Sequence, residues 1–145
     1  MFQHVLIPTD GSPLSAAAAE KAMAFARDAG ARVTMLSVVE PYPGITGDSV
    51  ERAEARAQFQ QMAREHTADS LSYAAQKARA LGIACQTVQA ENGDPWRVIV
   101  ETATAKGCDL IAMASHGRRG LAALLLGSQT TKVLTHSKIP VLVYR

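Results

Sequence analysis

The chain has 145 residues, enough for one domain with a sizeable core, and we expect residues 1–145 to form a single domain. Hydrophobic residues make up 48% and charged residues 19% of it, which excludes a disordered chain. The net charge of +2 is too small to indicate a nucleic-acid partner. No apolar run approaches the roughly 20 residues that span a bilayer, and no secretory signal pattern is present. We therefore expect a cytoplasmic protein without nucleic-acid or membrane partners.

Apolar runs and helical patterns alternate along the chain. The apolar, partly β-branched runs predict strands at residues 5–7, 33–39, 83–89, 110–114 and 141–144. The helical patterns and their start and stop residues predict four helices: one from the Ser12 N-cap and Pro13 to Gly30, one over about 50–81 and possibly broken once, one capped by Asp94-Pro95 and stopped by Gly107, and one over 128–136.

The long helix predicted over 50–81 is rich in charge and has a thin inner face. Small and apolar residues at helical spacing predict that face, namely Phe59, Met62, Ala63, Ser70, Ala74, Ala78 and Leu81. Strands that alternate with helices of this length pair in parallel, and continuously apolar strands indicate a sheet covered on both faces. The sequence therefore predicts an α/β fold in which ligands bind beyond the carboxyl ends of the strands.

Residues 113–128 read M-A-S-H-G-R-R-G-L-A-A-L-L-L-G-S and join a predicted strand to a predicted helix. Glycines allow a ligand close to the backbone, and a Gly-Ser pair at a helix start directs N–H groups and the positive end of the helix dipole to one point. From residue 115 onward the chain has five basic residues and no Asp or Glu. The loop is typical of a phosphate site, and the alternative is a surface loop before an N-capped helix.

The same segment resembles the nucleotide-binding signature of the universal stress proteins, G-x-x-G, nine residues, then G-[S/T]. Gly117 is the second glycine, Gly127-Ser128 closes the pattern, and Ala114 replaces the first glycine. Further pieces of the chain match the family in order: the first strand with its aspartate turn at 4–12, the second strand at 33–41, the third helix start at 93–95, and the close at 133–143.

This resemblance implies a flavodoxin-like or Rossmann-like open five-stranded parallel sheet of the adenine nucleotide alpha hydrolase-like type, in the order 3-2-1-4-5. It also implies ATP in the crevice between strands 1 and 4, with Mg²⁺ or Mn²⁺ held mainly through the phosphates. The backbone N–H groups of Gly117, Gly127, Ser128 and Gln129 would hold the anion. The full set of expected binding residues is Pro8, Thr9, Asp10, Val38, Met113, Ala114, His116, Gly117, Arg118, Gly120, Gly127, Ser128 and Gln129.

The roles of some of these residues remain open in the sequence. Asp10, which meets the nucleoside in the family, could instead be a turn residue that caps the helix after Ser12. Ala114 puts a methyl group where the family pattern brings the backbone close to the ligand, which is tolerable if φ is negative there. Arg118 and Arg119 could screen phosphate charge or remain exposed in the loop.

The resemblance implies a stress-response sensor or regulator rather than an enzyme. His116 is the only candidate general base near the loop, and phosphoryl transfer also needs a held metal ion and a positioned nucleophile. One alternative is a dimeric interaction module of the same fold that binds no nucleotide. The chain has neither the sequence motif of adenylating enzymes nor that of class I synthetases. It also lacks the acidic residues that a phosphoacceptor receiver domain needs.

The last predicted strand suggests an assembly. In the implied order it is a sheet edge made of apolar and aromatic residues, and an edge of this kind needs cover. We expect a homodimer in which this strand pairs with its own copy through Val141, Leu142 and Val143, as universal stress proteins do. The alternative is a monomer whose edge is shielded by Lys138, Pro140 and Arg145.

Overall fold

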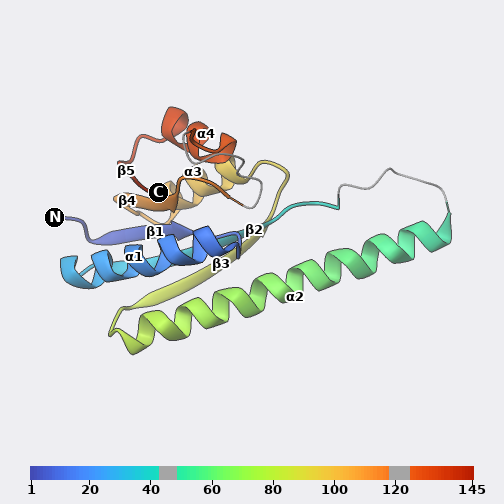
Figure 1. The fold of residues 1–145 in the computed structure, drawn as a ribbon, viewed down its shortest axis with the longest axis horizontal. Helices are drawn as coiled ribbons and strands as arrows, with labels where there is room; N and C mark the ends of the chain where they lie inside the picture. The colour runs from blue at the N-terminus through green and yellow to red at the C-terminus, as the bar shows by residue number, and fades with distance from the viewer. Residues whose placement is uncertain (43–48, 118–124) are drawn as a thin grey trace.

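The computed structural model describes residues 1–42, 49–117 and 125–145. Within these residues strands and helices alternate along the chain (Figure 1). In chain order they are β1 (His4–Pro8), α1 (Pro13–Ala29), β2 (Arg32–Val39), α2 (Val50–Ala80), β3 (Cys85–Glu91), α3 (Pro95–Ala105), β4 (Leu110–Ala114), α4 (Ser128–His136) and β5 (Val141–Tyr144).

The five strands form one sheet in the order β3-β2-β1-β4-β5, and every pair of neighbours is parallel. Helices α1 and α2 lie on one side of this sheet and α3 and α4 on the other (Figure 1). Val5 and Ile7 join the core beneath α1 and α2, whereas Leu6 joins the core beneath α3 and α4, because successive side chains of a strand point to opposite faces. This two-sided burial explains the continuous apolar runs, and the predicted fold is confirmed.

Local signals set the ends of α1 and the start of α3 at the predicted residues. Ser12 is the N-cap of α1, where its Oγ accepts a hydrogen bond from the N–H of Ser15 at 3.3 Å, and Gly30 ends the helix with φ at 69°. Asp94 occupies the N-cap position of α3, but its side chain makes no capping hydrogen bond. Its carboxylate lies 4.0 Å from Nε of Arg97 instead, so the predicted start of the helix at Asp94-Pro95 is confirmed without a side-chain cap.

The strand β3 begins and ends two residues later than predicted. Ile83, expected in the strand, donates its N–H to the carbonyl of Ala78 at 3.0 Å and so completes the end of α2. Gly82, in the left-handed conformation with φ at 75°, makes this reversal possible. All side chains of β3 are exposed or half-buried, so the expected cover on both faces holds for the inner strands but not for this edge.

The helix α2 is continuous, and its inner face differs from the predicted one. The buried residues are Gln60, Leu71, Ala75 and Ala78, so only Ala78 of the predicted set is buried. Phe59, Met62 and Leu81 are 50%, 70% and 38% exposed, and their assignment to the inner face was wrong. The first part of α2 runs past the end of the sheet, where there is little apolar surface to pack against (Figure 1). Among the described residues, no helix combines the length and apolar character that a membrane crossing requires.

Candidate functional site

Two adjacent cavities, which share Asp10 and Gly117, lie at the carboxyl ends of β1 and β4. We call the smaller one, of about 120 Å³, the inner cavity, and the larger one, of about 420 Å³, the outer cavity. The sheet order reverses between β1 and β4, and at such a reversal open α/β sheets bind their ligands.

The described residues of the expected site all line one or both of these cavities. In the inner cavity they are Pro8, Thr9, Asp10, Val38, Met113, Ala114, His116, Gly117 and Gln129. In the outer cavity they are Asp10, Val38, Gly117, Gly127, Ser128 and Gln129. Arg118, Arg119 and Gly120 lie outside the described residues.

The turn after β1 is organised by its own side chains. Asp10 Oδ1 accepts a hydrogen bond from the N–H of Ser12 at 2.9 Å, and Ser15 Oγ accepts one from the N–H of Asp10 at 3.1 Å. Gly11, with φ at 78°, allows the chain to turn here. Asp10 therefore does support the start of α1, as the alternative interpretation held, and it also lines both cavities.

Gly117, in the loop after β4, faces this aspartate turn. A Cβ atom at Gly117 would lie 2.8 Å from Oδ2 of Asp10, so a side chain there would require the Asp10 carboxylate to shift. A Cβ at Gly127 would lie 3.2 Å from the carbonyl oxygen of Ser115 and 3.3 Å from Cα of His116. Neither glycine has positive φ, so space rather than backbone freedom favours glycine at these positions.

One of the expected anion donors is already engaged. The N–H of Gly127 donates to the carbonyl of Ser115 at 2.8 Å, so assigning this N–H to the anion was wrong. Gly127 is instead the N-cap of α4, and its own carbonyl accepts from the N–H of Thr131 at 3.0 Å. The N–H groups of Ser128, Gln129 and Thr130 have no acceptor within the helix, and they concentrate the positive end of its dipole at the crevice.

Side chains of α4 fix its first turn against two neighbouring elements. Thr130 Oγ1 donates to the carbonyl of Ala114 at 3.0 Å, which ties α4 to the end of β4. Gln129 Oε1 accepts from the N–H of Trp96 at 2.9 Å, which ties α4 to the start of α3. The donors at the helix start are therefore held in place by packed strands and helices.

Known proteins resemble this chain over its whole length. The profile of the Universal stress protein family matches residues 1–145. This chain belongs to the universal stress protein family. It is 32% identical to the universal stress protein YxiE of Bacillus subtilis, with all of both chains covered, and 31% identical to MJ0531 of Methanocaldococcus jannaschii, with 100% of this chain and 83% of the relative covered. Its fold matches the solved structure of MJ0577 of the same archaeon with a TM-score of 0.85 and 26% identity, covering 99% of this chain and 95% of the other.

The departure of this universal stress protein from the family signature lies at Ala114. This residue is buried at the end of β4, and φ is positive at no non-glycine residue that the structure describes. The condition for tolerating alanine is therefore met in the backbone. Ala114 nevertheless lines the inner cavity, which makes the smaller cavity the place where the substitution would act.

His116 gives little support for hydrolytic chemistry. Its Nδ1 lies 3.0 Å from Oγ of Ser115, a neighbour that supplies no charge. Over residues 1–42, 49–117 and 125–145, no group of three or more His, Cys, Asp or Glu side chains could hold a metal ion.

Among the lining residues that the sequence interpretation missed, two sets stand out. The first comprises polar residues that brace the turn or the helix start, namely Ser15, Ser37 and Thr130. The second comes from α2 and consists of Phe59, Ala63, His66 and Thr67, which line the outer cavity. Their spacing places them on one helix face, but they mix aromatic, small and polar types, so no amphipathic pattern marks that face in the sequence.

Proposed function

We propose that this universal stress protein binds ATP in the crevice and acts as a sensor or regulator of the stress response in the cytoplasm. The proposal depends on one observation, that three features meet in one crevice. They are the aspartate turn, the tightly packed glycines Gly117 and Gly127, and the first turn of α4. A helix start with unpaired N–H groups is a favourable phosphate site.

The chemistry of the two cavities supports an orientation for the nucleotide. The inner cavity is bordered by apolar residues that include Leu36, Val38 and Ile99, which suit the faces of an adenine ring. The outer cavity is bordered by Ser128 and Gln129, whose N–H groups would donate to phosphate oxygens. Asp10 lies at the junction, where a carboxylate can accept hydrogen bonds from ribose hydroxyls.

A relative supports an adenine nucleotide as the ligand class. A solved universal stress protein in complex with cAMP matches this fold with a TM-score of 0.67 and 25% identity, covering 99% of this chain and 97% of the other. ATP with Mg²⁺ or Mn²⁺ carried on its phosphates is the ligand that we propose for this chain. We propose binding rather than turnover, in keeping with the sensor or regulator role that the family resemblance implies.

Calorimetry of the purified full chain tests this function. We expect heat of binding with Mg²⁺-ATP and weaker binding with Mg²⁺-GTP, because a guanine edge presents different hydrogen-bonding groups to the inner cavity. Mass spectrometry of any small molecule that co-purifies with the protein provides an independent check. If millimolar ATP gives no heat and no nucleotide co-purifies, the ATP proposal fails.

A nucleotide-free interaction module is the second candidate, and Ala114 favours it. Ala114 lines the cavity of about 120 Å³, where a small change in shape affects an adenine ring most. For either candidate we propose a homodimer through β5. This strand is an edge of the sheet, and its four residues are only half-buried in the single chain.

A further inference from the structure

The first part of α2 has little apolar contact with the sheet. Between its start and residue 70, the only buried residue is Gln60, whereas Leu71, Ala75 and Ala78 pack its last turns. An amphipathic helix is ordinarily held by a continuous apolar face, and this one lacks such a face over its first five turns. Another set of contacts must therefore hold residues 50–70 in position.

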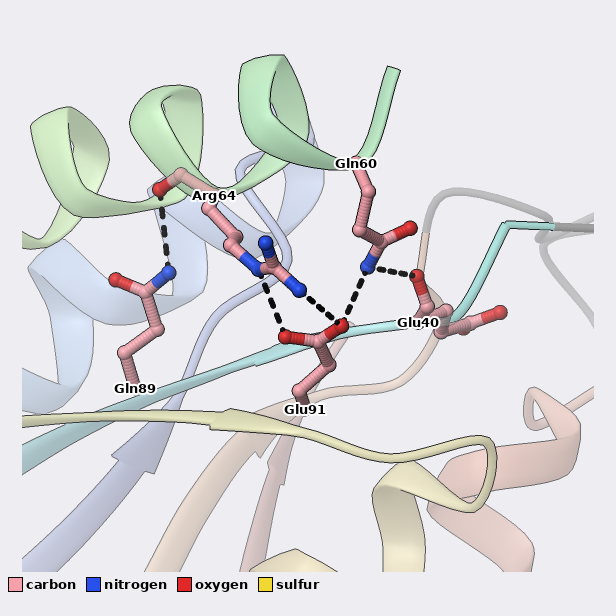
Figure 2. A network of polar contacts seen from close by, with 5 residues as sticks. All are labelled: Glu40, Gln60, Arg64, Gln89 and Glu91. Carbon is pink, nitrogen blue, oxygen red and sulfur yellow. Dashed lines mark hydrogen bonds and ion pairs between the residues drawn. The ribbon is translucent and has the colours of Figure 1, made fainter. Parts of the chain in front are cut away.

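A polar cluster around Glu91 provides those contacts (Figure 2). Glu91 Oε2 and Oε1 accept from Nε and Nη2 of Arg64 at 2.9 and 3.0 Å, and Oε1 also accepts from Nε2 of Gln60 at 2.8 Å. Gln60 Nε2 further donates to the carbonyl of Glu40 at 3.3 Å, and Gln89 Nε2 donates to the carbonyl of Arg64 at 3.1 Å. We call this group the Glu91 clamp.

The clamp joins α2 to the ends of β2 and β3 with specific geometry. Two parallel hydrogen bonds between a guanidinium and a carboxylate fix both direction and distance. The hydrogen bond from Arg64 lowers the pKa of Glu91, so the carboxyl stays ionised near neutral pH. Because Arg64 and Glu91 are partly exposed, we expect the clamp to orient α2 more than to stabilise the folded protein.

The clamp also fixes which face of α2 meets the crevice. Phe59, Ala63, His66 and Thr67 follow the spacing i, i+4, i+7 and i+8, which places them on one helix face. This face lines the outer cavity opposite the first turn of α4. The ring of Phe59 is braced by the ring of Tyr42, whose centroid is 5.0 Å away at an interplanar angle of 67°.

We propose that this face of α2 forms the outer wall of a subsite for the polyphosphate tail of the nucleotide, with Glu91 as its positioning residue. The inference rests on the proposed ATP function, and it adds a specificity for tail length. Thr67 and His66 can donate hydrogen bonds to phosphate oxygens, and the methyl of Ala63 leaves the space between the larger side chains open. Because Asp10 and Glu40 line the same cavity, the tail enters with its divalent cation, which reduces repulsion by these carboxylates.

Replacing Ala63 by leucine tests the wall directly. Ala63 is half-buried and lines the outer cavity, whereas Ala68 on the same helix is exposed and does not line it. We expect Ala63→Leu to weaken Mg²⁺-ATP binding by about tenfold or more and to change AMP binding much less, because only the longer tail reaches the filled space. Ala68→Leu is the matched control, and it should bind both nucleotides as the unchanged chain does.

The outcomes separate this inference from the proposed function. If the unchanged chain binds no ATP, both fail. If it binds ATP but Ala63→Leu binds ATP equally well, α2 is not a wall of the site. If Ala63→Leu weakens AMP and ATP by the same factor, the assignment of the wall to the phosphate tail is overturned.

Replacing Glu91 tests its positioning role. We expect Glu91→Ala to speed amide hydrogen exchange over residues 50–67 and to lower the preference for ATP over AMP, and we expect Glu91→Gln to do so less, because it keeps one acceptor oxygen. Glu65→Gln alters an exposed acceptor of Gln61 on the same helix and serves as the control. Faster exchange with an unchanged preference for ATP over AMP would show that the clamp is structural only, and would overturn the positioning role.

Discussion

The replacement of Gly127 by valine probes how closely the start of α4 must pack against the residues that follow β4. The position has φ at −63° and ψ at 157°, which any residue can adopt, so the backbone itself does not oppose a side chain. The obstacle is contact: a Cβ lies 3.2 Å from the carbonyl oxygen of Ser115 and 3.3 Å from Cα of His116, and both are backbone atoms. At such distances the backbone of Ser115 and His116, just after β4, must shift by a few tenths of an ångström relative to the start of α4.

The magnitude follows from the hydrogen bonds that such a shift disturbs. The bond from the N–H of Gly127 to Ser115 is 2.8 Å long and directly precedes the first turn of α4. Moving this turn misaligns the N–H groups of Ser128 and Gln129 with a phosphate. The loss of one such hydrogen bond costs about 1–3 kcal/mol, which corresponds to roughly a 5- to 150-fold loss of ATP affinity.

Calorimetry with Mg²⁺-ATP measures this loss, and thermal unfolding shows whether each variant remains folded. Gly127→Ala, which adds only the Cβ, should fall between the unchanged chain and Gly127→Val. Gly93→Ala is the control, because Gly93 also lines the outer cavity but a Cβ there meets nothing within 4 Å. Equal ATP affinity for Gly127→Val and the unchanged chain, with both folded, would falsify the assignment of this loop to the phosphates.

Two further predictions concern assembly and pH. Val143→Lys puts a charge on the β5 edge and should shift the protein from dimer to monomer in sedimentation velocity, whereas a variant as dimeric as the unchanged chain rules out this interface. Burial, aided by the charge of Arg32, lowers the pKa of His4 below its unfolded value, so the unfolded state binds more protons and stability should decrease as pH falls through that unfolded value. Urea unfolding at about pH 7.5 and about pH 5.5 measures this slope, which His4→Gln should reduce; identical slopes for both proteins contradict the assignment to His4.

The sequence by itself determined the elements whose signals are local. The strands at 110–114 and 141–144 and the helix at 128–136 have the predicted bounds, because apolar runs are bounded there by glycine, proline or a change of period. Ser12, Pro13 and Gly30 set the ends of α1 through hydrogen bonds and backbone angles that involve only near neighbours. The resemblance of ordered motifs to one family added the strand order, and with it the meeting of the turn after β1 with the loop after β4.

The tertiary structure alone decided what depends on contacts between distant segments. Gln60 is buried and Phe59 is exposed because Glu91, 31 residues beyond Gln60, anchors one face of α2; helical periodicity carries no record of that partner. The N–H of Gly127 is unavailable to an anion because the carbonyl of Ser115 accepts it across the loop, and the sequence shows only a glycine before a helix. The same reason explains why α2 lines the outer cavity. A few side chains that bind a long polar helix to another element decide which of its faces points inward, and only the folded chain brings those side chains together.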